Sequence, residues 1–198
     1  MYPSSIRNLI ECLKDLPGIG EKSAERLAYA IVGFDKERLD NFANSIVGIR
    51  DNIRKCSVCG CITDMDKCYI CNDMNRSSDT IFVVEKSKDI MLFEKIGTYN
   101  GKYHVLNGLI SPMEGINPED INLLSLLKRV EEDSVKEVIV VLKPSIEGET
   151  TMQYIKRILS KYNIKVSKIP IGIPMGTDIE YIDTMTLEMA FEDRKDVA

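Results

Sequence analysis

The chain has 198 residues, 44% of them hydrophobic and 29% charged, with a formal net charge of −5 at pH 7. This composition is typical of a soluble globular protein with one domain or two small ones. No apolar run reaches the roughly 18 residues of a membrane-spanning helix, and the N-terminus lacks the apolar region of a signal peptide. The cysteines require no oxidising compartment, so we expect a cytoplasmic protein.

The negative charge is concentrated at the C-terminal end. Residues 1–55 carry nine Lys/Arg and eight Asp/Glu, whereas residues 177–198 carry two basic and seven acidic side chains. The N-terminal part is therefore close to neutral. Any binding to DNA should be local, weak and sensitive to salt.

Three helices are predicted at the N-terminus. Apolar residues at helical spacing indicate amphipathic helices over residues 4–15, from about residue 24 to 31, and over residues 36–54. In the third helix we expect five apolar side chains to face inward: Leu39, Phe42, Ile46, Ile49 and Ile53.

The first two helices are separated by Leu-Pro-Gly-Ile-Gly at residues 16–20, which indicates a helix-hairpin-helix. Gly18 and Gly20 permit a tight turn close to a phosphate, and the first amides of the next helix can donate to an anion. Lys22 and Arg26 lie four residues apart on one helix face and could contact a DNA backbone without reading its sequence. In the alternative interpretation the glycines only form a turn, and the two cations are solvated and balanced by neighbouring acids, Glu21 and Glu25.

Two Cys-x-x-Cys pairs follow within sixteen residues: Cys56, Cys59, Cys68 and Cys71. This spacing predicts a tetrahedral all-thiolate zinc site, since a structural Zn²⁺ is commonly held by four cysteines. No recognition helix fits between the ligands, so we interpret the zinc as a structural staple. Four thiolates on one Zn²⁺ leave two net negative charges, which we expect nearby basic side chains to offset: Arg54, Lys55, Lys67 and Arg76.

Two cysteines remain outside this array. Cys12 is expected on the apolar face of the first helix as a small core residue. Cys61 is expected to be a spare, although it could replace Cys59 as a ligand.

Strands alternate with helices in the rest of the chain. Short apolar runs predict strands at 80–84, 103–106, 138–142 and 164–169, with helices after Asp89, at 118–131 and at 150–162. This order favours a parallel sheet with helices on both faces and ligands at the carboxyl ends of the strands. Glu85 and the Lys-Pro-Ser-Ile-Glu-Gly-Glu turn at 143–149 lie at such ends.

The motifs along the chain are, in order, the hairpin, the four cysteines, the Val-Val-Glu strand, Tyr-His-Val-Leu-x-Gly and x-Pro-x-x-Glu-Gly-Glu. The order of these motifs resembles the bacterial recombination mediator family RecR over essentially the whole chain. The C-terminal segment from Gly172 to Asp183 also resembles that family, with Thr177 in place of a glycine. The resemblance implies an α/β multidomain protein with a helix-hairpin-helix region at 1–54, a four-cysteine zinc finger at 55–78, a Toprim domain at 79–168 and a Walker-B-like oligomerisation segment at 169–198.

The same resemblance implies a DNA-encircling homotetramer. It also implies a partnership with RecO, and with RecF, in loading RecA onto single-stranded DNA coated by SSB. We therefore expect a non-enzymatic DNA clamp that binds single- and double-stranded DNA independently of sequence.

Toprim enzymes hold Mg²⁺ with a glutamate and an Asp-x-Asp pair. Glu85 matches the glutamate, but Lys143 and Ser145 occupy the Asp-x-Asp positions, and an ammonium repels the ion. We expect no metal-dependent phosphoryl transfer here. The resemblance implies instead that Glu85 and Glu147 belong to a surface that docks RecO or RecF; alternatively, Glu147 only complements the dipole of its helix.

Two rival functions remain open. One is a divergent Mg²⁺-dependent nuclease or primase that uses Glu85, Glu147 and Glu149. The other is a zinc module that contacts proteins without touching DNA.

His104, the only histidine, is interpreted as structural, and no Gly-x4-Gly-Lys-Ser/Thr loop is present to bind a nucleotide.

Overall fold

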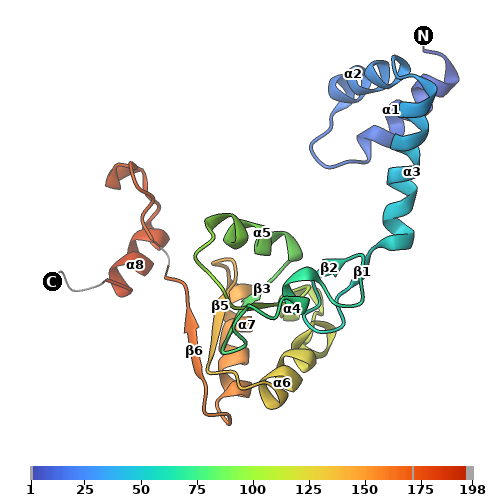
Figure 1. The fold of residues 1–198 in the computed structure, drawn as a ribbon. Coiled ribbons are helices and arrows are strands. Elements are labelled where there is room, and N and C mark those ends of the chain that lie inside the picture. The colour runs from blue at the N-terminus through green and yellow to red at the C-terminus, as the bar shows by residue number, and fades with distance from the viewer. Residues whose placement is uncertain (1, 171, 195–198) are drawn as a thin grey trace. The chain divides into compact units, whose positions relative to one another are not determined.

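The computed structural model describes residues 2–170 and 172–194, and the chain divides between Ile53 and Arg54 into two compact units (Figure 1). One buried apolar cluster lies in the first unit and two lie in the second. Within the described residues, no helix combines the length and the apolar character that crossing a bilayer requires.

The first unit consists of three helices: α1 (Ser4–Lys14), α2 (Glu21–Val32) and α3 (Lys36–Asn52). Gly18 has a φ of +84°, a conformation that favours glycine, so the chain reverses between α1 and α2 as the sequence predicts. The core is small, because Ile10, Ala24 and Ala28 are the only buried residues among residues 2–53. The helix-hairpin-helix prediction is confirmed.

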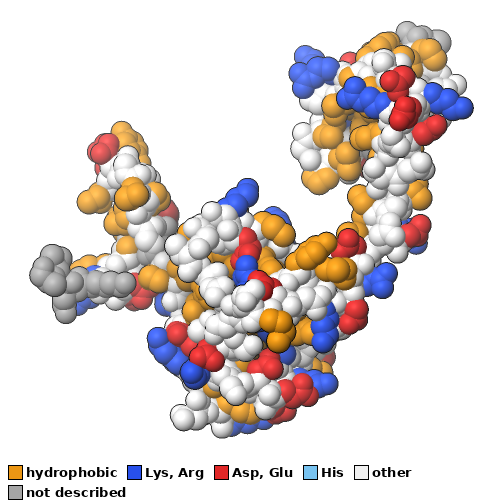
Figure 2. All heavy atoms as spheres, viewed as in Figure 1, with side chains coloured by type: hydrophobic (Ala, Val, Ile, Leu, Met, Phe, Trp, Pro, Cys, Tyr) orange, Lys and Arg blue, Asp and Glu red, His pale blue; other side chains and the backbone are white. Residues whose placement is uncertain are grey.

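Helix α3 contradicts one expectation. It has no buried residue, and the five apolar side chains expected to face inward are between 42% and 61% exposed: Leu39, Phe42, Ile46, Ile49 and Ile53. Figure 2 shows hydrophobic side chains at the surface of the N-terminal helices. The core of this unit lies between α1 and α2, so a single chain leaves the apolar face of α3 uncovered.

Cys12 is also exposed, contrary to expectation. It lies two residues after the buried Ile10, which is about 200° around an α-helix at 3.6 residues per turn. The side of α1 that packs on α2 is therefore opposite to Cys12.

The second unit begins with a two-stranded antiparallel pair, β1 (Arg54–Lys55) and β2 (Ile62–Thr63), followed by the short helix α4 (Tyr69–Asn72). Its main sheet is parallel, in the order β4-β3-β5-β6. The strands are β3 (Thr80–Val84), β4 (Lys102–Val105), β5 (Glu137–Val141) and β6 (Lys165–Lys168).

Helices connect these strands and follow the last one. The α-helices are α5 (Ser87–Ile96), α6 (Leu123–Glu132), α7 (Ile146–Leu159) and α8 (Thr184–Glu192). Three short 3₁₀ helices are η1 (Pro112–Glu114), η2 (Pro118–Asp120) and η3 (Ile179–Tyr181).

Both faces of the sheet are buried. Alternate side chains of a strand point to opposite faces, so Ile81 and Val83 of β3 join an apolar cluster with α6 and α7. Phe82 and Val84 join a second cluster that contains Ile90 of α5 and the cysteines. The prediction of a parallel sheet covered on both faces is confirmed.

Two helix boundaries differ from the sequence-based expectation. The segment expected to be helical from residue 118 divides into η2 and α6. Helix α7 begins at Ile146, four residues before the expected start, because the Ser145 side chain accepts a hydrogen bond from the Gly148 amide at 3.2 Å and caps the helix.

Candidate metal centre and nucleic-acid interface

The four predicted cysteine ligands come together in the second unit. The Sγ atoms of Cys56, Cys59, Cys68 and Cys71 all lie within 4.8 Å of one another, and three of the residues are buried. Sγ of Cys59 is 3.6 Å from Sγ of Cys68, and the Cys68 amide donates to Sγ of Cys56 at 3.3 Å. Four convergent sulfurs form a donor set that can bind a metal ion such as zinc.

The electrostatics of the cluster favour a bound cation. Hydrogen bonds from the thiols of Cys59, Cys61 and Cys71 lower the pKa of Cys68. Hydrogen bonding with Cys61, Cys68 and Cys71, together with burial, raises the pKa of Cys59. Crowded sulfurs cannot all ionise without a positive charge among them, and a divalent ion supplies that charge.

Groups of the main sheet hold the backbone of the first cysteine pair. The Val105 amide donates to the Cys59 carbonyl at 2.8 Å, and Nδ2 of Asn107 donates to the Gly60 carbonyl at 3.1 Å. Gly60 has a φ of +73°, and a Cβ there would lie 2.4 Å from Nδ2 of Asn122. A glycine is therefore required where the cysteine loop packs against the end of β4.

The hairpin of the first unit presents two free cations. Lys22 and Arg26 are exposed on α2, and no carboxylate lies within 4.0 Å of either among the described residues. The two neighbouring acids are engaged elsewhere: Glu21 pairs with Lys14 at 2.7 Å, and Glu25 accepts a hydrogen bond from the Tyr2 hydroxyl at 2.9 Å. Neither acid therefore forms a direct ion pair with Lys22 or Arg26, which are left exposed to solvent.

The first turn of α2 is also open to an anion. Gly20 is its N-cap residue and offers no side chain to the amides of that turn. The exposed ends of such amides, together with the helix dipole, favour a negatively charged ligand. Gly18, Gly20, Lys22 and Arg26 thus lie on one hairpin, as the sequence predicts.

The predicted partner-binding residues lie at the carboxyl edge of the main sheet. Glu85 follows β3, and the turn from Lys143 follows the neighbouring strand β5, in register with it. The Ser145 hydroxyl donates to Oε2 of Glu147 at 2.8 Å, and this hydrogen bond lowers the pKa of Glu147. Glu85 pairs with Lys86 at 3.1 Å. Both carboxylates therefore have basic or hydroxyl partners.

The turn after β5 is tightly built. A Cβ on Gly148 would lie 2.1 Å from the Lys143 carbonyl oxygen, so only glycine fits there. Among the described residues, the group of side chains close enough to hold a metal ion is the four-cysteine cluster, and Glu85, Glu147 and Glu149 are not part of it.

Three family models match this chain. A RecR helix-hairpin-helix model matches residues 6–49, a Toprim-domain model matches residues 79–170, and a RecR C-terminal model matches residues 172–195. The chain belongs to the RecR family. RecR membership supports a role in recombinational DNA repair, with DNA binding and self-association.

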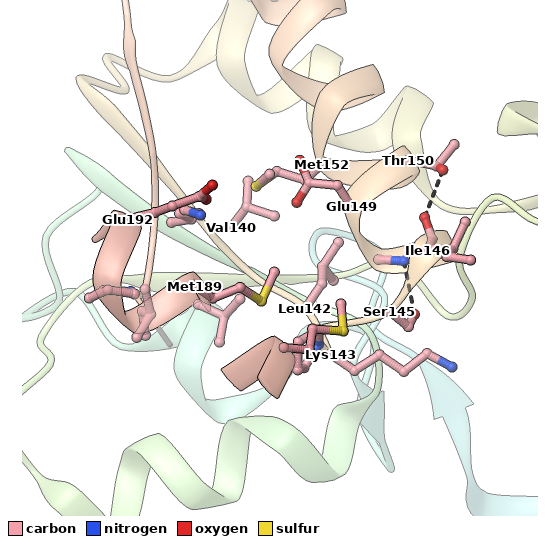
Figure 3. A pocket seen from close by; sticks show the side chains of 17 residues that line it. Val140, Leu142, Lys143, Ser145, Ile146, Glu149, Thr150, Met152, Met189 and Glu192 are labelled. Atoms are coloured by element: carbon pink, nitrogen blue, oxygen red, sulfur yellow. Dashed lines mark hydrogen bonds between the residues drawn. The ribbon is translucent and has the colours of Figure 1, made fainter. Parts of the chain in front are cut away.

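A cavity of about 610 Å³ lies beside the turn that follows β5 in the Toprim domain of this RecR protein (Figure 3). Lys143 and Ser145 line it from the turn between β5 and α7, and Met152 lines it from α7. Met189 and Glu192 line it from α8. The position of α8 beside this turn was not predicted from the sequence. Three methionines and four charged side chains line the cavity, so this edge of the Toprim domain is a mixed apolar and polar surface.

Sequence reasoning also missed the asparagines that hold the cysteine loop of this RecR protein. Asn107 has a φ of +61°, a conformation that asparagine tolerates better than most residues. The Asn-Gly pair at 107–108 is a turn signal that could have identified it. His104 is fully buried, with Nε2 2.6 Å from the Asn122 carbonyl oxygen, which places it in the structural interior.

Proposed function

We propose that this protein is a non-enzymatic DNA-binding clamp in recombinational repair. In this proposal it acts with RecO, and with RecF, to load RecA onto SSB-coated single-stranded DNA. The observation that carries the DNA-binding part is the hairpin of the first unit, where Lys22 and Arg26 are exposed without a carboxylate partner beside the open first turn of α2. Contacts of this kind bind phosphates and are independent of sequence.

The proposed metal is one structural Zn²⁺ per chain, bound by Cys56, Cys59, Cys68 and Cys71. Four thiolates fill the tetrahedral coordination of Zn²⁺ and leave no open position for a substrate. The ion therefore stabilises the cysteine loop at the start of the second unit and takes no part in a reaction. The contacts of this loop with Val105 and Asn107 support its role as a staple on the Toprim domain.

The proposed assembly is a homo-oligomer, in the form of a ring-shaped tetramer. Four exposed apolar residues of α3 and its C-cap residue repeat at intervals of three and four: Leu39, Phe42, Ile46, Ile49 and Ile53. This is the spacing of a helix that packs along another helix. A second copy supplies a matching stripe, and several weak hairpins on one DNA then gain from a high effective concentration.

The proposed partner surface includes Glu85 and Glu147 at the edge of the Toprim sheet. Lys143 and Ser145 stand where a Toprim enzyme needs carboxylates, and Ser145 is occupied as the cap of α7. These observations favour docking over Mg²⁺ chemistry. Cleavage of DNA that depends on Mg²⁺ or Mn²⁺ and is lost in Glu85→Ala would support the nuclease or primase alternative instead.

The DNA-binding proposal is tested by the anisotropy of a labelled single-stranded oligonucleotide across a salt series. Lys22→Ala/Arg26→Ala should weaken binding at least about tenfold at low salt. Each lost phosphate contact should reduce the slope of log K against log salt by about 0.7. Lys36→Ala/Arg50→Ala, which removes two exposed cations from α3, is the matched control and should bind nearly as the wild type does.

An unchanged affinity and salt slope in the Lys22→Ala/Arg26→Ala protein would contradict the hairpin assignment. If the wild-type protein also failed to bind DNA at low salt, the remaining function would be a zinc module for protein contacts.

A further inference from the structure

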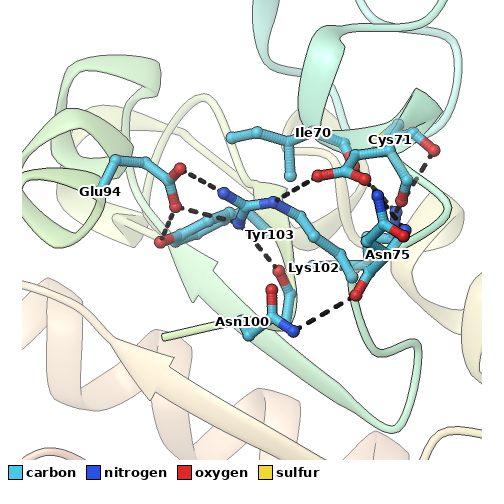
Figure 4. Close-up of polar contacts among 10 residues, drawn as sticks. Ile70, Cys71, Asn75, Glu94, Asn100, Lys102 and Tyr103 are labelled. Atoms are coloured by element: carbon cyan, nitrogen blue, oxygen red, sulfur yellow. Dashed lines mark hydrogen bonds and ion pairs between the residues drawn. The ribbon is translucent and has the colours of Figure 1, made fainter. Parts of the chain in front are cut away.

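A buried lysine lies next to the second cysteine pair. Lys102 is the first residue of the edge strand β4 and is only 8% exposed. Its ammonium donates to three backbone carbonyls, those of Ile70 at 2.8 Å, Cys71 at 3.4 Å and Asp73 at 2.6 Å (Figure 4). An ammonium has three donors, so these acceptors satisfy all of them.

The three carbonyls belong to the end of α4 and the residue that follows it. The last carbonyls of a helix have no partner within the helix, and a cation there is favoured by the helix dipole. Lys102 thus fixes the backbone that carries Cys71, whereas Val105 and Asn107 hold the loop of the first cysteine pair. Strand β4 therefore contacts both cysteine pairs, one at each of its ends.

The charge of Lys102 lacks a conventional partner. Among the described residues, no carboxylate lies within 4.0 Å of its ammonium nitrogen. A buried charge is costly unless an opposite charge lies near it. A tetrathiolate zinc centre carries two net negative charges, and the Lys102 ammonium is bonded to the backbone of one of its ligands.

The cations expected to offset that charge are placed differently. Arg76 forms its ion pair with Glu94 and a second with Asp73 at 3.6 Å, so its charge is already balanced (Figure 4). The other three expected cations are exposed to solvent, which screens them: Arg54, Lys55 and Lys67. None of the four expected cations is therefore both buried and free of a carboxylate partner. Buried Arg129 likewise has a carboxylate partner, Asp133 at 3.9 Å.

We propose that Lys102 is a positioning residue of the metal centre, which holds the Cys68–Cys71 loop in its ligating conformation and supplies the buried counter-charge of the tetrathiolate. It is not a ligand. The inference rests on the proposed zinc site. Groups that hold the ligands of a metal in place commonly contribute about 10–100-fold to metal affinity.

The test is the rate at which full-length protein, loaded with one Zn²⁺ per chain, releases the metal to a chromogenic chelator. Lys102→Met should release zinc about 10–100-fold faster than the wild type. Lys102→Arg, which keeps a long cationic donor, should restore the rate to within about threefold of the wild type. Lys67→Met removes an exposed cation from between the ligands and is the matched control; it should also stay within about threefold.

The absorption spectrum of the Co²⁺-substituted protein is a second, independent measurement of the same metal centre. Co²⁺-loaded Lys102→Met should retain the absorption of a tetrahedral thiolate site, because all four ligands remain. If Lys102→Met does not fold, Lys102→Gln is measured instead, because its shorter neutral amide should also release zinc at least about tenfold faster.

Equal release rates for the wild type and the neutral Lys102 variant would overturn the inference while the zinc site stands. Equal acceleration in Lys67→Met would also overturn it, because general charge would then explain the effect. Failure of the wild-type protein to bind zinc or cobalt at all would instead remove the proposed metal centre, and the inference with it.

Discussion

The two units of the chain differ in how completely a single copy buries its apolar residues. In the second unit both faces of the parallel sheet are covered, and even the metal centre lies within an apolar cluster. Of the described residues of the first unit, only Ile10, Ala24 and Ala28 are buried, and α3 has no buried residue. The second unit thus buries its apolar residues within one copy, whereas the first presents an apolar surface that another helix can cover.

The largest effect is expected from removal of a metal ligand. Cys68→Ser should reduce the zinc content from one ion per chain to nearly none. Binding of a structural Zn²⁺ contributes on the order of 10 kcal/mol in small zinc-binding peptides, so the loss should strongly destabilise the cysteine loop. Elemental analysis of the purified protein and thermal unfolding measure the two effects.

Cys61→Ser is the matched control for this change, because Cys61 is buried beside the cluster but is not one of the four convergent sulfurs. It should keep one zinc per chain. If Cys61→Ser lost the metal and Cys68→Ser retained it, the ligand assignment would be wrong.

A charge on the apolar face of α3 should disrupt the oligomer. Ile46 is 57% exposed in one copy, and burying an isoleucine side chain contributes about 1.5–3 kcal/mol. In an interface between two identical helices Ile46→Asp is present twice, so self-association should weaken at least about 100-fold. Light scattering over a range of protein concentrations measures the change.

Val47→Asp is the control for this position. Val47 is as exposed as Ile46, at 64%, but it points away from the stripe of Leu39, Phe42, Ile46, Ile49 and Ile53. Its substitution should leave the oligomer intact. Equal dissociation by both variants would contradict a specific seam along α3.

A smaller effect is expected from acid. Burial lowers the pKa of His104 from 6.5 to about 4, because the interior disfavours the charged imidazolium. Between these values the unfolded chain binds a proton that the folded chain does not. The stability from neutral His104 is therefore fully present above pH 6.5 and is lost as the pH falls toward 4, with a loss of about 2 kcal/mol at pH 5 relative to pH 7.

Urea unfolding of the wild type and of His104→Gln at pH 7 and pH 5 measures this loss. Acid also protonates the metal-binding thiolates, but this contribution is common to both proteins and cancels in their difference. If the gap between the two proteins did not change with pH, His104 would not titrate as its burial requires.

The sequence predicted the features that depend on local spacing. The two Cys-x-x-Cys pairs predicted the convergent sulfurs. The short, continuously apolar strands that alternate with helices predicted a parallel sheet buried on both faces. The Pro-Gly-x-Gly turn predicted the hairpin, because few conformations are compatible with Gly18 at a positive φ.

The features that depend on distant contacts were not predictable in the same way. The Lys102 ammonium donates hydrogen bonds to backbone carbonyls about thirty residues earlier in the chain. Nothing in its local sequence distinguishes it from a solvated lysine. Arg76 is paired by Glu94, eighteen residues away. For α3 the amphipathic pattern predicted an apolar face, but a pattern cannot tell whether that face is covered by the same chain or by another.

The most direct test of a clamp built from several copies is the mass of the wild-type protein, measured by sedimentation equilibrium with and without single-stranded DNA at low and high salt. The account predicts an oligomer of several chains in both salts, which binds DNA at low salt and releases it at high salt. A protein that has the mass of one chain at working concentration, with no DNA bound at low salt, would contradict it.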